Sequence, residues 1–490
     1  MLLRRTVSLV AIVAAAPALA AHTLGDAWRI ALSDAPLVEA SRTEAAAAGQ
    51  ELLVASAQAR PNASLRTGYT TRTSDARFLT GAPLPGGPSR FELPYAPQNN
   101  AAFSVRAAAP LWTAGRVGSA IAAADARHDA STEASTWVGM QTRMRVAEAY
   151  IGILQAERAV GVAAQRLSAS RQRLADTQRR QANQHATDRD LAGSRLQVAR
   201  DELGLLECRN SLSRALLEYE HALGRGDACV EKLVEPSVVW LSDPLQDLTN
   251  CAIACRPDLA EVREVIAGHR YESASWSAAR RPQVSAEVSF DYQENPYQTP
   301  QSIGSAGVYL DWALLDGGKR RHTAEAASSR AAAAHARLRE LQSIVAAEVL
   351  DAWNGRAERE AAVQVAERRV AYATEHERWV RERFSSGMVF QSECADAATA
   401  LAEAQAEQFY ARTDLFLAQL RLRLVAGRLT DEALVPTYDG APTLADAGDP
   451  AEASALSPGE EVEPPAAANE PPPTIELLPT PADAASGDAP

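Results

Sequence analysis

Near the start of the chain, apolar residues are spaced as on one face of a helix. From residue 24 to residue 60 they recur every three or four positions, as an amphipathic helix requires. The pattern breaks once at Pro36 and ends at Arg60-Pro61, because the proline ring disfavours a helical residue before it. The sequence therefore predicts a helix in two segments over residues 24–60.

After residue 61 the spacing changes to strict alternation, which is typical of a half-exposed β-strand. One alternating run covers residues 63–72 and a second covers residues 101–108. The stretch 73–99 between them is rich in Pro and Gly and predicts a long loop. Two more runs, residues 284–292 and 306–312, are joined by a shorter loop. The pattern therefore predicts four strands per chain.

Two very long helices follow the strand pairs. Residues 116–182 contain no Pro and are rich in Ala, Gln, Arg and Glu, which predicts a continuous helix about 100 Å long. The chain then turns and returns over residues 188–223, and residues 319–385 with a return to 426 repeat the plan. Each pair of shorter helices adds up to one long helix, so we expect the short helices to stack end to end beside it.

The chain is an internal duplication. An offset of 203 positions superimposes Gly115-Arg116 on Gly318-Lys319 and Leu223-Gly224-Arg225 on Ala426-Gly427-Arg428. Upstream the offset is 221, so the two repeats differ by 18 residues in the loop between their strands. A period of about 200 residues is too long for a solenoid and predicts a duplicated domain. We place the first repeat at residues 22–240 and the second at residues 241–430.

Small residues dominate the long helices. Runs of Ala over residues 122–124 and 331–334 leave only narrow apolar stripes. Such stripes favour close packing between helices in the manner of a coiled coil over a thick globular core.

The two ends of the chain have compositions of their own. Residues 1–21 carry two Arg, an apolar run and small residues before Ala21, the layout of a cleavable secretory signal. The apolar run is too short to cross a bilayer. Residues 431–490 form an acidic, Pro-rich tail that we expect to be disordered.

Charge and cysteine content exclude several classes of function. The net charge of −13 comes mostly from the tail, so nucleic acid binding has no support. Five Cys are too few for a disulfide scaffold. Cys229 with Cys251 or Cys255 is a candidate bridge, and unpaired core thiols are the alternative. The eight His show no metal-ligand spacing, and no phosphate loop or nucleophile elbow is present, so we expect no metal, no cofactor and no enzyme activity.

Four strands cannot close into a barrel, which takes about eight. The sequence offers no spare amphipathic helix to cover the sheet, so several identical chains must pool their strands. No segment outside residues 1–21 is a hydrophobic span, but membrane β-strands alternate and escape that test. The apolar face suits lipid, and the polar face suits a wet lumen. The apolar positions are Leu65, Tyr69, Phe103, Val105, Val288, Phe290, Val308, Leu310 and Trp312; the polar ones are Arg66, Arg72, Arg106, Glu287 and Asp311.

The plan of helix, strand, loop, strand and long hairpin, present twice, resembles the TolC family of outer membrane efflux and secretion channels. The motifs that carry the resemblance are Leu111-Trp112-Thr113-Ala114-Gly115-Arg116, Leu314-Leu315-Asp316-Gly317-Gly318-Lys319 and Arg383-Phe384-Ser385-Ser386-Gly387. The resemblance implies a homotrimer with a twelve-stranded β-barrel in the outer membrane and an α-helical barrel across the periplasm. It also implies a periplasmic adaptor (membrane fusion) protein and an inner-membrane pump of the RND or ABC type as partners, and a passive duct for drugs or polypeptides.

The same resemblance assigns a gate to the tips of the helical hairpins. Glu393 and Asp396 match acidic positions whose rings narrow the pore, and Asp190 and Phe384 match positions that hold the closed tip. Rings of carboxylates at a constriction favour cations. Two departures are Val389, where a latching Arg is expected, and Gln184, where the first turn is expected to carry Gly. A solvated helix face is the alternative interpretation of the acids.

Three classes of function remain open at this point. The leading one is an outer membrane exit duct. The others are a periplasmic coiled-coil adaptor or scaffold and a secreted surface protein, and a soluble β-sandwich is the alternative for the strands.

Overall fold

The computed structural model describes residues 23–81, 91–226, 233–238, 240–241 and 243–434. Both repeats follow the predicted plan. The first contains α1 (Leu24–Asp34), α2 (Pro36–Ala57), β1 (Asn62–Thr71), β4 (Asn99–Trp112), α3 (Arg116–Ala182) and α4 (Asp188–Leu223). The second contains α5 (Leu245–Cys255), α6 (Pro257–Ala278), β5 (Gln283–Gln293), β6 (Ser302–Asp311), α7 (Lys319–Ser385) and α8 (Gln391–Val425). The signal sequence predicted for residues 1–21 lies outside the described residues.

Proline breaks the first helix of each repeat at the same place. Ala35 ends α1 and precedes α2 with an extended backbone (φ −65°, ψ 122°), and Pro36 is the first residue of α2. Arg256 does the same between α5 and α6 (φ −66°, ψ 128°), followed by Pro257. The residue before a proline avoids the helical region, and proline suits the first helical position. The break predicted at Pro36 is therefore confirmed and recurs in the second repeat.

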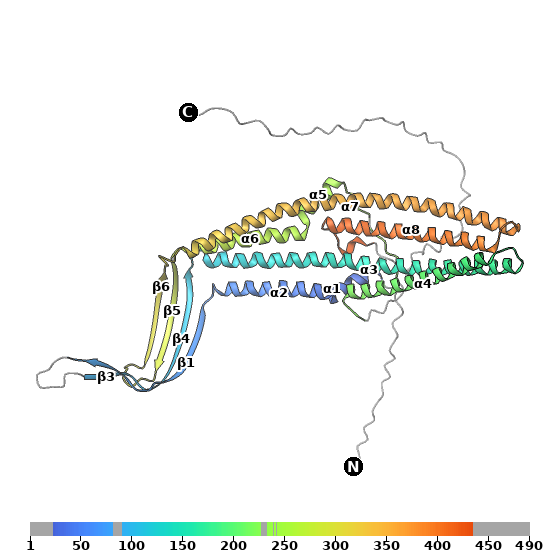
Figure 1. The fold of residues 1–490 in the computed structure, drawn as a ribbon. Coiled ribbons are helices and arrows are strands. Elements are labelled where there is room, and N and C mark those ends of the chain that lie inside the picture. The colour runs from blue at the N-terminus through green and yellow to red at the C-terminus, as the bar shows by residue number, and fades with distance from the viewer. Residues whose placement is uncertain (1–22, 82–90, 227–232, 239, 242, 435–490) are drawn as a thin grey trace, which may run out of the picture. The chain divides into compact units, whose positions relative to one another are not determined.

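Four strands form one antiparallel sheet in the order β1-β4-β5-β6 (Figure 1). Their registers pair Leu65 with Val105, Val105 with Phe290, and Val284 with Leu310. Every apolar position predicted for the outer face therefore falls on one face, as period 2 requires, except Trp312, which follows the end of β6. Arg66, Arg106 and Glu287 fall on the other, where Arg106 lies 3.9 Å from Asp291.

The loop predicted over residues 73–99 is wrong in one respect. It contains a second antiparallel pair, β2 (Ala76–Thr80) and β3 (Phe91–Ala96). The rings of Phe78 and Tyr95 stack across this pair with centroids 4.2 Å apart, and Arg77 bonds Glu92 at 2.7 Å. Five- and six-residue strands flanked by Pro and Gly are too short for alternation to stand out from a loop.

The short helices lie beside the long ones, as their lengths predict (Figure 1). Both α2 and α4 pack on α3, and both α6 and α8 pack on α7. The two repeats meet where α3 packs against α6 and α8. Small residues make these contacts close: a Cβ added to Gly268 of α6 would lie 3.6 Å from the carbonyl oxygen of Ala123.

In each repeat, a glycine after the returning helix packs closely against the residue that precedes the proline between the two short helices. Gly224 (φ 76°) follows α4, and a Cβ there would lie 2.7 Å from the Ala35 Cα. Gly427 (φ 71°) follows α8, and a Cβ there would lie 3.1 Å from the Arg256 Cα. Positive φ suits glycine after a helix, and the lack of a side chain permits the close approach.

The largest buried side chains gather where α1 crosses α3 and α4. Trp28 donates its indole N–H to the Arg143 carbonyl oxygen at 2.8 Å, and the Tyr150 hydroxyl donates to the Val234 carbonyl oxygen at 2.7 Å. A short 3₁₀ helix, Asp431–Ala433, closes this region, with Ala433 fully buried. The described structure thus continues four residues past 430, and residues 435–490 of the predicted tail lie outside it.

Among the described residues, no helix is both long enough and apolar enough to cross a membrane. Cys208, Cys251, Cys255 and Cys394 are free thiols. Cys229 lies outside the described residues, so the candidate bridge from Cys229 has no structural account.

Candidate functional site

The tip of the first hairpin joins α3 to α4. Gln184 takes a left-handed backbone (φ 61°), which an L side chain adopts at a cost. Thr187 then caps α4: its hydroxyl accepts from the Asp190 N–H at 3.2 Å, and Asp190 accepts from the Thr187 N–H at 2.9 Å. This is a capping box, which satisfies two free N–H groups at the helix start. These bonds from the Thr187 backbone and hydroxyl hold the pKa of Asp190 below its usual range.

The tip of the second hairpin has the same construction 203 positions later. Gly387 takes the left-handed conformation (φ 72°) at the position equivalent to Gln184. Glu393 accepts a long hydrogen bond, 3.4 Å, from the Phe390 N–H at the start of α8. Phe390 offers no side-chain acceptor in return, so this cap is weaker than that of Thr187. Asp190 and Glu393 are therefore equivalent first-turn carboxylates, one at each tip.

The two tips are side by side. The Arg180 guanidinium, on the last turn of α3, lies 5.4 Å from the centroid of the Phe390 ring. Phe384, on the last turn of α7, lines a cleft of about 700 Å³ between α3, α7 and α8, together with Cys394. All four residues predicted for the gate, Glu393, Asp396, Asp190 and Phe384, thus lie within two turns of a hairpin tip.

Asp396 differs from the other acids because it has a cationic partner on the first repeat. Arg173 of α3 forms an ion pair with it, with side chains 46% and 40% exposed. One further pair, Arg166 with Glu403 at 2.6 Å, lies two turns farther along α8. Both pairs line a cleft of about 230 Å³ between α3 and α8. Asp396 therefore joins the two hairpins within one chain.

Sequence reasoning missed Arg173, Arg180 and Phe390. Arg173 is 223 residues from Asp396, so only the packing of α3 on α8 brings the pair together. Val389, where a latching Arg is expected, is partly buried. Arg173 and Arg180 both belong to α3.

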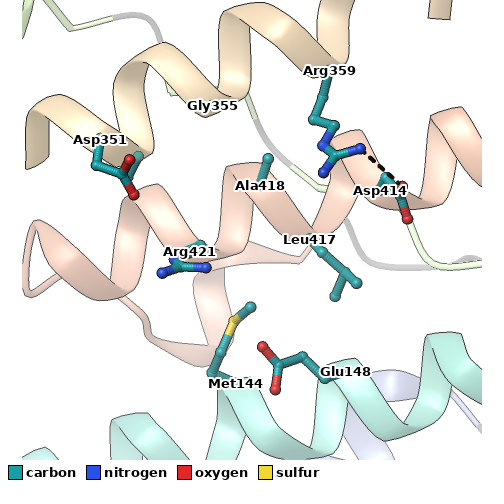
Figure 2. A pocket seen from close by; sticks show the side chains of 10 residues that line it. Met144, Glu148, Asp351, Gly355, Arg359, Asp414, Leu417, Ala418 and Arg421 are labelled. Carbon is teal, nitrogen blue, oxygen red and sulfur yellow. Dashed lines mark hydrogen bonds and ion pairs between the residues drawn. The ribbon is translucent and has the colours of Figure 1, made fainter. Parts of the chain in front are cut away.

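Farther from the tips, a third cleft lies between α3, α7 and α8 (Figure 2). It measures about 280 Å³, and Met144 and Glu148 of α3 face Arg421 and Leu417 of α8 across it. Arg359 of α7 reaches Asp414 at 3.3 Å. The described residues contain no group of three or more His, Cys, Asp or Glu placed to hold a metal ion.

Comparison with known proteins agrees with this fold. A membrane protein from Pseudomonas aeruginosa has a TM-score of 0.67 at 19% identity, covering 82% of this chain and 93% of its own. The outer membrane protein VceC from Vibrio cholerae gives 0.65 at 16% identity, covering 82% and 96%. The CmeC outer membrane channel of Campylobacter jejuni gives 0.67 at 12% identity, covering 84% and 86%.

The sequence itself matches no curated protein. It does match a family model, that of the outer membrane efflux proteins, over residues 248–428, which is nearly the whole of the second repeat. The first repeat has the same plan and the same glycine and proline landmarks. The match to the outer membrane efflux protein model is therefore a likeness of residues 248–428 to that family.

Proposed function

We propose that this protein is the outer membrane exit duct of a tripartite efflux system and works as a homotrimer. The observation that carries the proposal is a pair of exposed apolar stripes on α4 and α7. Each stripe has equivalent positions in the other repeat, and half of these are buried inside the chain.

The exposed edges and apolar face of the sheet also support the proposal. Its outer strands, β1 and β6, have no neighbour on their free edges among the described strands, and all residues of β1 are exposed. Exposed edges and an exposed apolar face are unfavourable in water, because edges pair with other chains and apolar area seeks burial. Strands pooled from several copies remove the edges, and lipid covers the apolar face.

The stripes lie on α4 and α7, the helices of the two hairpins that no second hairpin of the same chain covers. The α4 stripe consists of Leu196, Leu203, Leu206 and Leu217, and each of these side chains is at least 52% exposed. The α7 stripe consists of Leu350, Val365, Tyr372 and Trp379, each at least 47% exposed. Several members recur at intervals of seven, the spacing of a coiled-coil seam.

The packing of α3 on α8 inside the chain indicates what such stripes contact. Shifted by 203 positions, the α4 stripe falls on Thr399, Ala406, Phe409 and Leu420 of α8, and the α7 stripe falls on Ala147, Val162, Ala169 and Asp176 of α3. Ala406, Leu420 and Ala169 are at most 5% exposed, and Ala169 and Thr399 line the same cleft between α3 and α8. The α7 stripe of one copy therefore fits the α4 stripe of the next.

A contact between two different surfaces of identical chains closes into a ring when its rotation permits. Three copies supply six hairpins and twelve strands, enough to close both a helical wall and a barrel. In this ring the carboxylates of Asp190, Glu393 and Asp396 gather at the periplasmic tips, where they favour cations. The adaptor and the inner-membrane pump dock at that end, and the protein supplies only the passage.

The test places a charge in the seam. Leu203→Glu buries a carboxylate against the neighbouring α7, whereas Arg209→Glu puts the same side chain about 120° away from Leu203 around α4. We expect the wild-type protein and Arg209→Glu to be trimers by light scattering in detergent and to conduct ions in planar bilayers. We expect Leu203→Glu to be monomeric and to conduct no ions, with its helix content retained.

Two outcomes would count against the proposal. A trimer of normal conductance in Leu203→Glu would show that the stripes do not form the seam. A wild-type protein that is a monomer without detergent would favour the adaptor or scaffold class.

A further inference from the structure

A pair of thiols lies far from the hairpin tips, at the end of α5. Cys251 and Cys255 are one helical turn apart, and such a spacing holds two Cβ atoms about 5–6 Å from each other. Cys251 is partly buried and Cys255 is exposed. Positions four apart on a helix lie on the same side of it, so the two side chains are neighbours.

A cationic side chain completes the cluster. The Nε of Arg428 donates to the Cys251 Sγ at 3.1 Å, and its other end bonds Asp243 at 3.0 Å. Arg428 directly follows Gly427, whose close contact with Arg256 fixes this segment against the helix. The guanidinium is therefore held beside the sulfur atoms by the fold and not by the thiols alone.

We propose that Cys251 and Cys255 bind one monovalent thiophilic cation, Cu(I) or Ag(I), between their two sulfur atoms. Soft thiolate ligands select such ions over hard cations. Both thiols lose their protons on binding, so two protons leave for each ion that arrives. The resulting centre of two thiolates and one monovalent cation carries a charge of −1, which is partly offset by Arg428, whose other end pairs with Asp243.

The ligand set argues for this class of ion. Structural zinc takes four protein ligands, and the part of the chain that the structure describes has no group of three or more suitable residues. A two-coordinate ion needs only the pair. Burial and the neighbouring Cys255 raise the pKa of the Cys251 thiol, and Arg428 opposes that shift. Binding of the ion weakens as the pH falls, because protons compete with the metal for the two sulfur atoms.

The site is independent of the proposed duct function, so the test uses binding. The parent is the full chain in detergent with Cys208, Cys229 and Cys394 replaced by Ser, which leaves only the pair. Reduced, anaerobic protein is titrated with Cu(I) against a chromophoric Cu(I) chelator. We expect one Cu(I) per chain and the release of two protons. Adding Cys255→Ser should lower the affinity at least about a hundredfold, and adding Arg428→Gln about tenfold.

The matched control adds Cys251→Ser and Cys255→Ser together to the same parent. It should bind no Cu(I) at the same chelator concentration, with helix content and particle mass unchanged. Tight binding by this control, or unchanged affinity after Cys255→Ser, would overturn the proposal. Displacement of Cu(I) by an equal concentration of Zn(II) would also overturn it, because a two-thiolate site should not prefer zinc.

Discussion

At the scale of single residues, an ion pair connects the two hairpins near their tips. Arg173 and Asp396 connect α3 to α8 near the tips, and both side chains are partly exposed. An exposed pair contributes roughly 0.2–1 kcal/mol, too little to hold one chain folded. In a trimer three such pairs act on one aperture and contribute roughly 0.6–3 kcal/mol together. That range is enough to set the ratio of closed to open tips.

We therefore expect Arg173→Asp to raise the resting conductance of single channels, because the introduced carboxylate would repel Asp396. The charge-swapped double variant, Arg173→Asp with Asp396→Arg, should restore the low conductance. The control is Arg166→Asp, which breaks the pair with Glu403 two turns farther from the tip and should leave conductance unchanged. Equal conductance in the single and the swapped variants would mean that the charge of Asp396 does not control the gate.

At the scale of helices and strands, most of the fold could be predicted, since proline and glycine mark nearly every boundary. The ends of α3, α4 and α7 agree with the predicted residues, and Pro36 marks the break between α1 and α2. The β2–β3 pair was missed because its strands are short and lie among turn residues. The partner of Asp396 could not be predicted, since helix packing sets the register between α3 and α8, and composition does not.

The close contacts of Gly224 and Gly427 provide a prediction at this scale. Gly224→Ala adds a methyl group 2.7 Å from backbone atoms of Asp34 and Ala35, which cannot move without shifting the break between α1 and α2. Gly427→Ala meets Arg256 at 3.1 Å or more, so its neighbour has to give less. Both also force alanine into positive φ, which costs about 1–2 kcal/mol.

We therefore expect Gly224→Ala to lower the thermal midpoint more than Gly427→Ala. Gly152→Ala is the control, because nothing lies within 4 Å of a Cβ there and its backbone is helical. Alanine should be neutral or slightly stabilising at that position, by up to about 1 kcal/mol. A larger loss at Gly427 than at Gly224 would mean that steric contact does not decide the cost.

At the scale of the whole molecule, the proposal requires the two faces of the sheet to meet different media. Val308 and Tyr309 are neighbours on β6, 67% and 49% exposed in the single chain, and they point to opposite faces. In the proposed barrel Val308 would face lipid and Tyr309 would face the lumen. Arginine on the lipid face costs about 2–4 kcal/mol near the bilayer midplane, whereas a wet lumen accepts it.

Val308→Arg should therefore reduce the amount of trimer recovered from the outer membrane, and Tyr309→Arg should assemble normally. The two variants carry the same new side chain one residue apart, so the net charge added is the same. Tyr309→Arg should in addition shift the ion selectivity of single channels toward anions, because three guanidinium groups enter one pore. Equal recovery of both variants would mean that the sheet does not divide lipid from water, and the pooled barrel would then be wrong even if the helical stripes join the copies.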